Sequence, residues 1–186
     1  MIYILAGHTP KGINQDPGAV SVHNKITYRE ADLTMELRDL IADEIRSMGG
    51  SVWEDDDTHR LNSVLIEVKS TEKDVVCDIH FNSAANNKAT GVEVFIPDRF
   101  TGQEFAFGKK LCDRFSLIMG IPNRGVRTES QSNRGRIGTL REFGINLLIE
   151  VGFLSNATDL ARYQEHKKKI VREAALILFE ADNLIK

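Results

Sequence analysis

An α/β fold with one central sheet, mostly parallel or mixed, and helices on both faces is predicted by two patterns in the sequence. Short apolar runs occur at 2–5, 75–79 and 147–149, and runs of this length are typical of strands buried on both faces. Between these runs lie segments whose apolar residues recur at helical spacing. Because strands and helices alternate along the chain, we expect helices to cover both faces of the sheet. A chain of 186 residues is most simply one domain, over residues 1–186.

Local signals justify the individual elements. The helix at 28–48 has apolar residues three or four positions apart, and Gly49-Gly50 ends it. The helix at 101–119 is opened by Thr101, and Glu104 is placed to complete a capping box. The first half of the chain is predicted to contain a strand at 2–6, a loop at 9–26, the helix at 28–48, a strand at 51–53, a solvated acidic turn at 54–57 and a helix at 59–72. The loop at 9–26 is marked by Pro10, Gly12, Pro17 and Gly18. The second half is predicted to contain strands at 74–80 and 91–96, the helix at 101–119, a loop at 121–138, a strand at 146–151 and two short helices that close the chain near Ile185.

The composition excludes several classes of protein. The net charge is -3, which gives no electrostatic case for binding nucleic acid or an anionic membrane, so we expect neither. No apolar stretch is long enough to span a bilayer. The N-terminal apolar run has no basic region before it, so we expect no signal peptide and synthesis and folding in the cytoplasm. Cys77 and Cys112 are expected to be reduced core thiols, because two cysteines make no disulfide framework.

Four residues stand where a mononuclear zinc hydrolase needs them. His8, His80 and Glu150 each come after a short apolar run that predicts a strand, and Glu30 lies near the start of the helix at 28–48. Chemistry in open α/β sheets gathers at the carboxyl ends of the strands, so these side chains are expected to share one cleft. Two imidazoles and one carboxylate are a common catalytic zinc set, with the fourth position left for water. The sequence therefore predicts zinc as the cofactor.

Each of these residues also has a structural interpretation. His8 taken alone is more typical of a hydrogen-bonded structural histidine. Glu30 fits a capping box with Thr27, and on helix rules alone that interpretation wins. Strand alternation places His80 on a polar face with Asp78 and Asn82, either as a site or as a satisfied strand end.

Glu150 is the least ordinary of the four. A carboxylate within so apolar a run must be paired, coordinated or protonated, because burying a bare charge is costly. Its structural alternative is a buried ion pair with Arg141.

The remaining polar groups give weaker signals. His23, His59 and His166 are expected to be exposed. The acidic run at 54–57 lacks the spaced oxygen ligands and the glycine of a calcium loop. Four arginines in the loop at 121–138 either face an anionic ligand or are merely solvated: Arg124, Arg127, Arg134 and Arg136.

With these residues in view, the chain resembles the zinc-dependent N-acetylmuramoyl-L-alanine amidases of the Amidase_3 type over nearly its whole length. The most specific match is 149–156, Ile-Glu-Val-Gly-Phe-Leu-Ser-Asn, which is similar to the family signature Val-Glu-x-Gly-Phe-Leu-Ser-Asn. Segments 4–8, 30–33 and 79–82 resemble the family's segments around its first histidine, its glutamate and its second histidine. Arg124-Gly125-Val126 and Leu140-Arg141 are also similar to family positions. The departures are Asp78, where serine is usual, and Gly144-Ile145 in place of Pro-Ala.

The resemblance implies a division of roles. His8, Glu30 and His80 would hold zinc, and Glu150 would be the catalytic base and then the acid. Asn82 and Arg141 are candidate substrate-binding residues. The implied reaction is hydrolysis of peptidoglycan at the amide between the lactyl group of N-acetylmuramic acid and L-alanine of the stem peptide.

Two other functions compete with this one. A zinc peptidase acting on peptidoglycan peptides would use the same metal set, and a non-catalytic wall-binding module would keep only the fold. The amidase interpretation leads us to expect a monomeric lysin, of phage type or otherwise autolytic. Such a lysin would have no separate wall-binding domain and would act on the cell wall after release.

Overall fold

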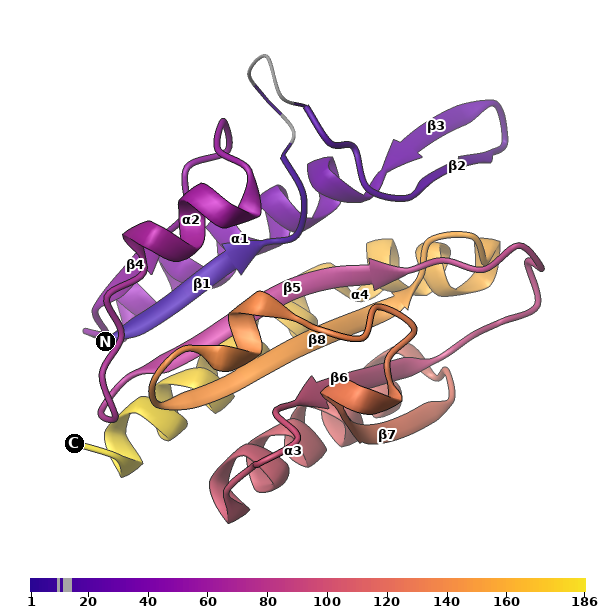
Figure 1. The fold of residues 1–186 in the computed structure, drawn as a ribbon. Coiled ribbons are helices and arrows are strands. Elements are labelled where there is room, and N and C mark those ends of the chain that lie inside the picture. Colours follow the sequence, from indigo (N-terminus) through magenta and orange to yellow (C-terminus); the bar gives the residue numbers. More distant parts are fainter. Residues whose placement is uncertain (10, 12–14) are drawn as a thin grey trace.

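The computed structural model describes residues 1–9, 11 and 15–186, which fold around one mixed sheet (Figure 1). The sheet has six strands in the order β4-β1-β5-β8-β6-β7. All neighbouring pairs are parallel except β6 and β8, which run antiparallel. The elements are β1 (Ile2–Ala6), β2 (Val20–His23), β3 (Ile26–Arg29), α1 (Glu30–Ser47), β4 (Val52–Glu54), α2 (Leu61–Glu67), β5 (Val75–Asn82), β6 (Val92–Ile96), α3 (Gly102–Met119), β7 (Asn123–Thr128), the 3-10 helices η1 (Glu129–Gln131) and η2 (Gly138–Arg141), β8 (Ile145–Phe153) and α4 (Ala157–Leu184).

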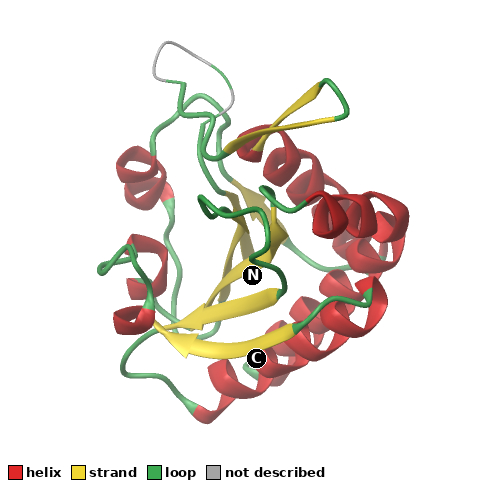
Figure 2. Ribbon diagram, turned by 90° about the vertical axis from the view of Figure 1, so that its right-hand side faces the viewer, coloured by secondary structure: helices red, strands yellow, loops and turns green. Residues whose placement is uncertain are grey.

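Helices cover both faces of the sheet, as the sequence predicts, but unequally. Helices α1, α3 and α4 pack on one face over the main hydrophobic core (Figure 2). Among the described residues, the opposite face has two small apolar clusters, one under α2 and one under η2. Strand alternation decides which side chain faces which layer: Ile79 and Ile149 join the main core, whereas Asp78, His80 and Glu150 occupy the other pleat. The thinly covered face therefore receives the polar side chains.

Several predicted elements are confirmed. The strands at 2–6, 51–53, 74–80, 91–96 and 146–151 correspond to β1, β4, β5, β6 and β8 within a few residues. Thr101 caps α3 in a capping box with Glu104. Cys77 and Cys112 are buried free thiols. None of the described helices is both long and apolar enough to cross a membrane.

The loop predicted at 9–26 is partly wrong, because its end forms the first strand of a hairpin. Strands β2 and β3 pair antiparallel through a two-residue turn at Asn24-Lys25, where both residues have positive φ, 51° and 66°. This is the geometry of a type I′ hairpin turn, which asparagine favours. The hairpin also delays the start of α1 to Glu30. Pro10 and Gly12, two of the residues that predicted the loop, lie outside the described residues.

Two predictions in the second half are also wrong. The loop predicted at 121–138 contains β7, an edge strand paired only with β6, which explains its polar sequence. The two short terminal helices are one helix, α4, of 28 residues. Its sequence has neither glycine nor proline to interrupt it, and Tyr163, Ile170 and Leu178 all pack into the main core.

The acidic turn predicted at 54–57 is not simply solvated. Asp55 is buried, and its Oδ1 accepts a hydrogen bond from Arg38 Nη1 at 2.9 Å. Arg38 is itself buried and also forms an ion pair with Asp57. The helix predicted at 59–72 shortens to α2. Asp55 and Asp57 are therefore engaged with a buried arginine rather than arranged around a cation, and Asp56 alone is exposed and accepts from the Thr58 N–H.

Candidate metal and catalytic centre

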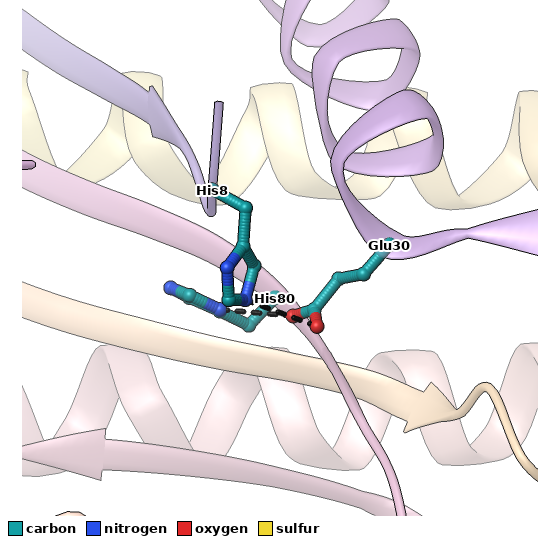
Figure 3. Close-up of side chains that lie close together, drawn as sticks. All are labelled: His8, Glu30 and His80. Carbon is teal, nitrogen blue, oxygen red and sulfur yellow. Dashed lines mark hydrogen bonds and ion pairs between the residues drawn. The ribbon is translucent and has the colours of Figure 1, made fainter. Parts of the chain in front are cut away.

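Three of the predicted residues meet beyond the carboxyl ends of β1 and β5 (Figure 3). His8 follows β1 with a positive φ of 75°, His80 lies near the end of β5, and Glu30 is the first residue of α1. One ligand atom from each residue lies within 4.8 Å of the others. Gly7 makes this approach possible, since a Cβ there would lie only 2.4 Å from the His80 ring. The fold thus brings together side chains that are far apart in sequence.

Glu30 lies between the two histidines. Its Oε1 is 3.0 Å from His80 Nδ1, and its Oε2 is 3.1 Å from His8 Nε2. The backbone N–H groups of Phe81 and Ala19 each donate to one of these oxygens. Burial opposes the charged form, but hydrogen bonds from both histidines outweigh it and hold the pKa of Glu30 well below its usual range. The capping-box interpretation is wrong, because the N-cap of α1 is Arg29, which makes no side-chain capping bond.

Each histidine is held from its other nitrogen by an aspartate. His8 Nδ1 lies 2.9 Å from Asp16 Oδ2, and His80 Nε2 lies 3.3 Å from Asp78 Oδ1. Burial lowers the pKa of His80, but the negative charges of Asp78 and Glu30 outweigh it and raise that pKa to about 10. Carboxylates placed behind histidine ligands are the usual outer shell of a protein metal site, because they fix the orientation of the ring.

The geometry fits a divalent metal ion. Ligand atoms on a tetrahedral zinc, with bonds of about 2.0–2.1 Å, stand about 3.3 Å apart. The two histidine–Glu30 separations, 3.0 and 3.1 Å, are close to that value. His8 Nε2 is buried, and its 3.1 Å contact with Glu30 Oε2 is the one polar contact that it makes among the described residues, so this nitrogen is placed for a ligand bond rather than used in the fold. Two nitrogens and one carboxylate oxygen also leave a fourth position open for water.

Glu150 lies beside this group on β8, in register with His80. Its carboxyl group is buried, and Oε2 has no hydrogen-bond partner in the described part of the chain. Burial, aided by the charge of Glu30, raises the pKa of Glu150 to about 7 despite the opposing charge of His80. The alternative ion pair with Arg141 is wrong, because Arg141 Nη2 donates to Glu129 Oε2 at 2.8 Å. Glu150 is thus able to take up and release a proton near neutral pH.

Two cavities meet at the centre. The α2-side cavity, of about 560 Å³, is lined by residues that include His80, Asp55, His59 and Arg136. The β6-side cavity, of about 470 Å³, is lined by residues that include Glu30, Asn82, Glu93 and Glu150. The residues that line both are His8, Arg134, Ile137 and Leu148. A ligand that spans the metal group would therefore occupy a cavity on each side of it.

The remaining candidates are placed differently. Asn82 lines the β6-side cavity and donates a hydrogen bond to Glu93. Arg141 lines neither cavity and is held by Glu129. His59 is exposed as expected, whereas His23 and His166 are half-buried, and His23 Nε2 lies 2.9 Å from the carbonyl oxygen of Leu154.

Asp16, Glu93 and Arg134 were not identified as site residues from the sequence. The only signal for Asp16 was its position in the loop between His8 and Glu30, and that for Glu93 was a lone acid within an apolar strand. Arg134 was one of four loop arginines that local pattern could not separate.

Comparisons with known structures find the same fold. The catalytic domain of the N-acetylmuramoyl-L-alanine amidase CwlV from Bacillus (Paenibacillus) polymyxa var. colistinus is 23% identical, with a TM-score of 0.70, and the match covers 100% of this chain and 98% of that one. The catalytic domain of the CD27L endolysin, which targets Clostridia difficile, is 18% identical with a TM-score of 0.70, covering 98% and 96% of the two chains. Cwp6 from Clostridium difficile is 22% identical with a TM-score of 0.78; the match covers 97% of this chain and 29% of Cwp6.

The chain thus spans less than a third of the length of Cwp6. No curated protein matches the chain. The family model Amidase_3, described as N-acetylmuramoyl-L-alanine amidase, matches residues 2–177. Since that match takes in all six strands of the sheet and the cluster of His8, Glu30 and His80, the chain belongs to the Amidase_3 family and is an N-acetylmuramoyl-L-alanine amidase.

Proposed function

We propose that this enzyme hydrolyses the amide between the lactyl group of N-acetylmuramic acid and L-alanine of the peptidoglycan stem, with a zinc ion held by His8, Glu30 and His80. The observation that carries the proposal is the convergence of three ligand atoms within 4.8 Å beside a buried Glu150. When bound, zinc supplies Lewis acidity, which lowers the pKa of a water molecule to about neutral and polarises the amide carbonyl.

Glu150 moves the proton. In its ionised form it accepts a proton from the attacking water, and the resulting acid then protonates the leaving nitrogen of L-alanine. Both steps need a group whose pKa is close to the working pH, and burial has raised that of Glu150 to about 7. An amide nitrogen leaves only when protonated, so a nearby acid is needed as well as a nucleophile.

The neighbouring groups hold the reacting residues in place. Asp16 and Asp78 orient the two imidazoles so that His8 Nε2 and His80 Nδ1 face Glu30. Backbone N–H groups of Ala19 and Phe81 fix the Glu30 carboxylate. Leu148 and Ile137 line both cavities and make their junction partly apolar. All of these residues come from one chain, which supports a monomer as the active form.

The test is metal content and turnover on the same purified protein. About one zinc per chain is expected, with clearing of a peptidoglycan suspension lost on chelation and restored by zinc. Identification of the newly freed amine separates the candidate activities. New N-terminal L-alanine, with muramic acid left unsubstituted, supports the amidase, whereas new termini within the stem or cross-bridge would indicate the peptidase. Chelator-insensitive binding without clearing would indicate the wall-binding module.

We further propose that residues 1–186 act as a lytic catalytic domain of the endolysin kind. The likeness to the CD27L catalytic domain over 98% of the chain supports this at the level of the fold. Purified protein added from outside to intact cells and to isolated walls is the appropriate assay. A lysin of this kind clears isolated walls, and it clears intact cells wherever the wall is accessible.

A further inference from the structure

The wall of the β6-side cavity is built around a buried acid, Glu93. Its Oε2 accepts from Arg124 Nε at 2.9 Å and lies 3.1 Å from Arg127 Nε, and Asn82 donates to its Oε1. The Glu93 side chain is only 4% exposed, while those of Arg124 and Arg127 are 30% and 38% exposed. One buried carboxylate thus holds two guanidinium groups at the cavity surface.

Three arginines line this cavity, Arg124, Arg127 and Arg134, and its carboxylates are those of Glu30, Glu93 and Glu150. Arg124 is further engaged by the Thr90 carbonyl and by the Phe153 ring, whose centroid is 5.0 Å away. Arg134 also lines the cavity, and it forms no ion pair with any other residue of the described chain. Arg134, and Arg127 through the exposed part of its guanidinium group that Glu93 does not engage, are therefore the cations that a ligand could contact. Three arginines thus gather on one cavity wall although the chain as a whole has a net charge of -3.

The position of Glu150 indicates which half of the substrate occupies which cavity. Glu150 lines the β6-side cavity and is not among the residues that line the α2-side cavity. In the proposed reaction, this carboxyl group protonates the leaving nitrogen, which is the first atom of the peptide product. The peptide half of the substrate must then leave through the β6-side cavity, and the glycan half lies on the α2 side.

We propose that Arg127 and Arg134 form a carboxylate-binding subsite for the stem peptide, an inference that rests on the proposed function. They would recognise the free α-carboxylate of the acidic residue that follows L-alanine. A guanidinium binds a carboxylate through two parallel N–H···O bonds, and it loses one of them when the carboxylate is replaced by a neutral amide. The cavity of about 470 Å³ is in the usual size range of small-ligand sites, which accommodates a short peptide. The enzyme thus distinguishes acidic stems from amidated ones.

The experiment compares two small substrates that differ in one group. One is N-acetylmuramoyl-L-alanyl-D-glutamate with its γ-carboxyl group capped as a methylamide, and the other is the same compound with its α-carboxylate also converted to an amide, so that the α-carboxylate is the one acidic group by which they differ. The wild-type enzyme is expected to cleave the acid with a kcat/KM roughly tenfold to a hundredfold higher, as a charge-assisted bidentate contact implies. The Glu150→Gln variant should bind the acid more tightly than the amide by a similar factor, which measures recognition without turnover.

Arg134→Ala is the decisive variant, and Arg136→Ala is its matched control. Both arginines are exposed in the same turn, but only Arg134 lines the β6-side cavity. Arg134→Ala should reduce the acid-to-amide ratio at least severalfold, whereas Arg136→Ala should leave that ratio unchanged. Equal cleavage of the two substrates by the wild type, or an unchanged ratio in Arg134→Ala, would overturn the subsite and leave the amidase mechanism standing. Preferential binding of the acid without release of L-alanine from the lactyl group would instead fail the proposed function.

Discussion

Glu150 lies directly beside His80 in the parallel pairing of β8 with β5, so the proposed proton-transfer group and a proposed metal ligand are neighbours across the sheet. On its other side, Glu150 is in register with Glu93 of β6. His80, Glu150 and Glu93 thus form a row across three strands on the same face of the sheet. This row connects the cluster of His8, Glu30 and His80 to the wall of the β6-side cavity. The backbone ladder itself fixes these positions, which is a more rigid support than a loop provides.

Glu150→Gln is expected to lose turnover and to keep its metal. The amide occupies the same volume but cannot carry the proton, so kcat/KM on peptidoglycan should fall by at least about a thousandfold, within the range for general acid–base catalysis. Zinc content, measured by elemental analysis, should stay near one per chain. His80→Ala is the comparison and should lose both metal and turnover. Activity within tenfold of wild type in Glu150→Gln would show that another group moves the proton.

The same variant should be more stable than the wild type in the metal-free protein, and more so as pH rises. The pKa of Glu150 is raised from 4.5 to about 7 in the folded state, so between these values the folded protein holds a proton that the unfolded chain has lost. Folding stability therefore falls as pH rises through this window. Removing the carboxyl group relieves a cost of about 3 kcal/mol at pH 8 and well under 1 kcal/mol at pH 4.5. Urea unfolding with chelator at both pH values measures this, and a pH-independent difference would contradict it.

Asp78→Asn should weaken metal binding without unfolding the protein. Asp78 Oδ1 lies 3.3 Å from His80 Nε2, and its Oδ2 accepts from Thr139 Oγ1 at 2.9 Å. The loss of this charge should reduce zinc affinity by about tenfold to a hundredfold, as measured by competition with a chromogenic chelator. Thr139→Val, which removes only the support of Asp78, should have a smaller effect in the same direction. An affinity equal to that of the wild type in Asp78→Asn would show that Asp78 does not orient His80.

Gly144→Ala should destabilise the fold strongly, and Gly49→Ala only slightly. Both glycines have a positive φ, 91° and 84°, which costs a side chain about 1 kcal/mol. At Gly144, a Cβ would also lie 2.1 Å from the Asp74 carbonyl oxygen, whereas at Gly49 nothing is within 4 Å. The expected losses in the free energy of unfolding are about 3 kcal/mol or more and about 1 kcal/mol. Equal losses in urea unfolding would show that the backbone near Asp74 yields to the new methyl group.

The parts of this molecule that sequence predicts are those with a local signal. The runs around β1, β5 and β8 are apolar because both faces of these strands are covered, and that alone placed His8, His80 and Glu150 at one edge. The metal group was accordingly predicted as a set. Its assembly around Glu30 depends on where α1 begins, and local helix rules favoured the wrong role for that residue.

The features that the sequence did not predict depend on contacts between residues that are far apart in the chain. Strand β7 is polar because it lies at the sheet edge, so its sequence has the composition of a loop. Arg134 and Arg141 are chemically identical in the sequence, and only the structure shows that Glu129 engages one while the other borders both cavities. The partner of a charged side chain is a tertiary property, which no periodicity encodes.

The unequal covering of the two sheet faces separates folding from substrate choice. The main core lies under α1, α3 and α4, while the cavity walls include short α2 and the residues between β7 and β8. Insertions and charge changes in those walls leave most of the buried apolar area intact. The residues that contact substrate can therefore change with little loss in the free energy of unfolding. Replacing segment 128–138 by the corresponding segment of a related enzyme is the direct way to change which peptidoglycan the enzyme cleaves.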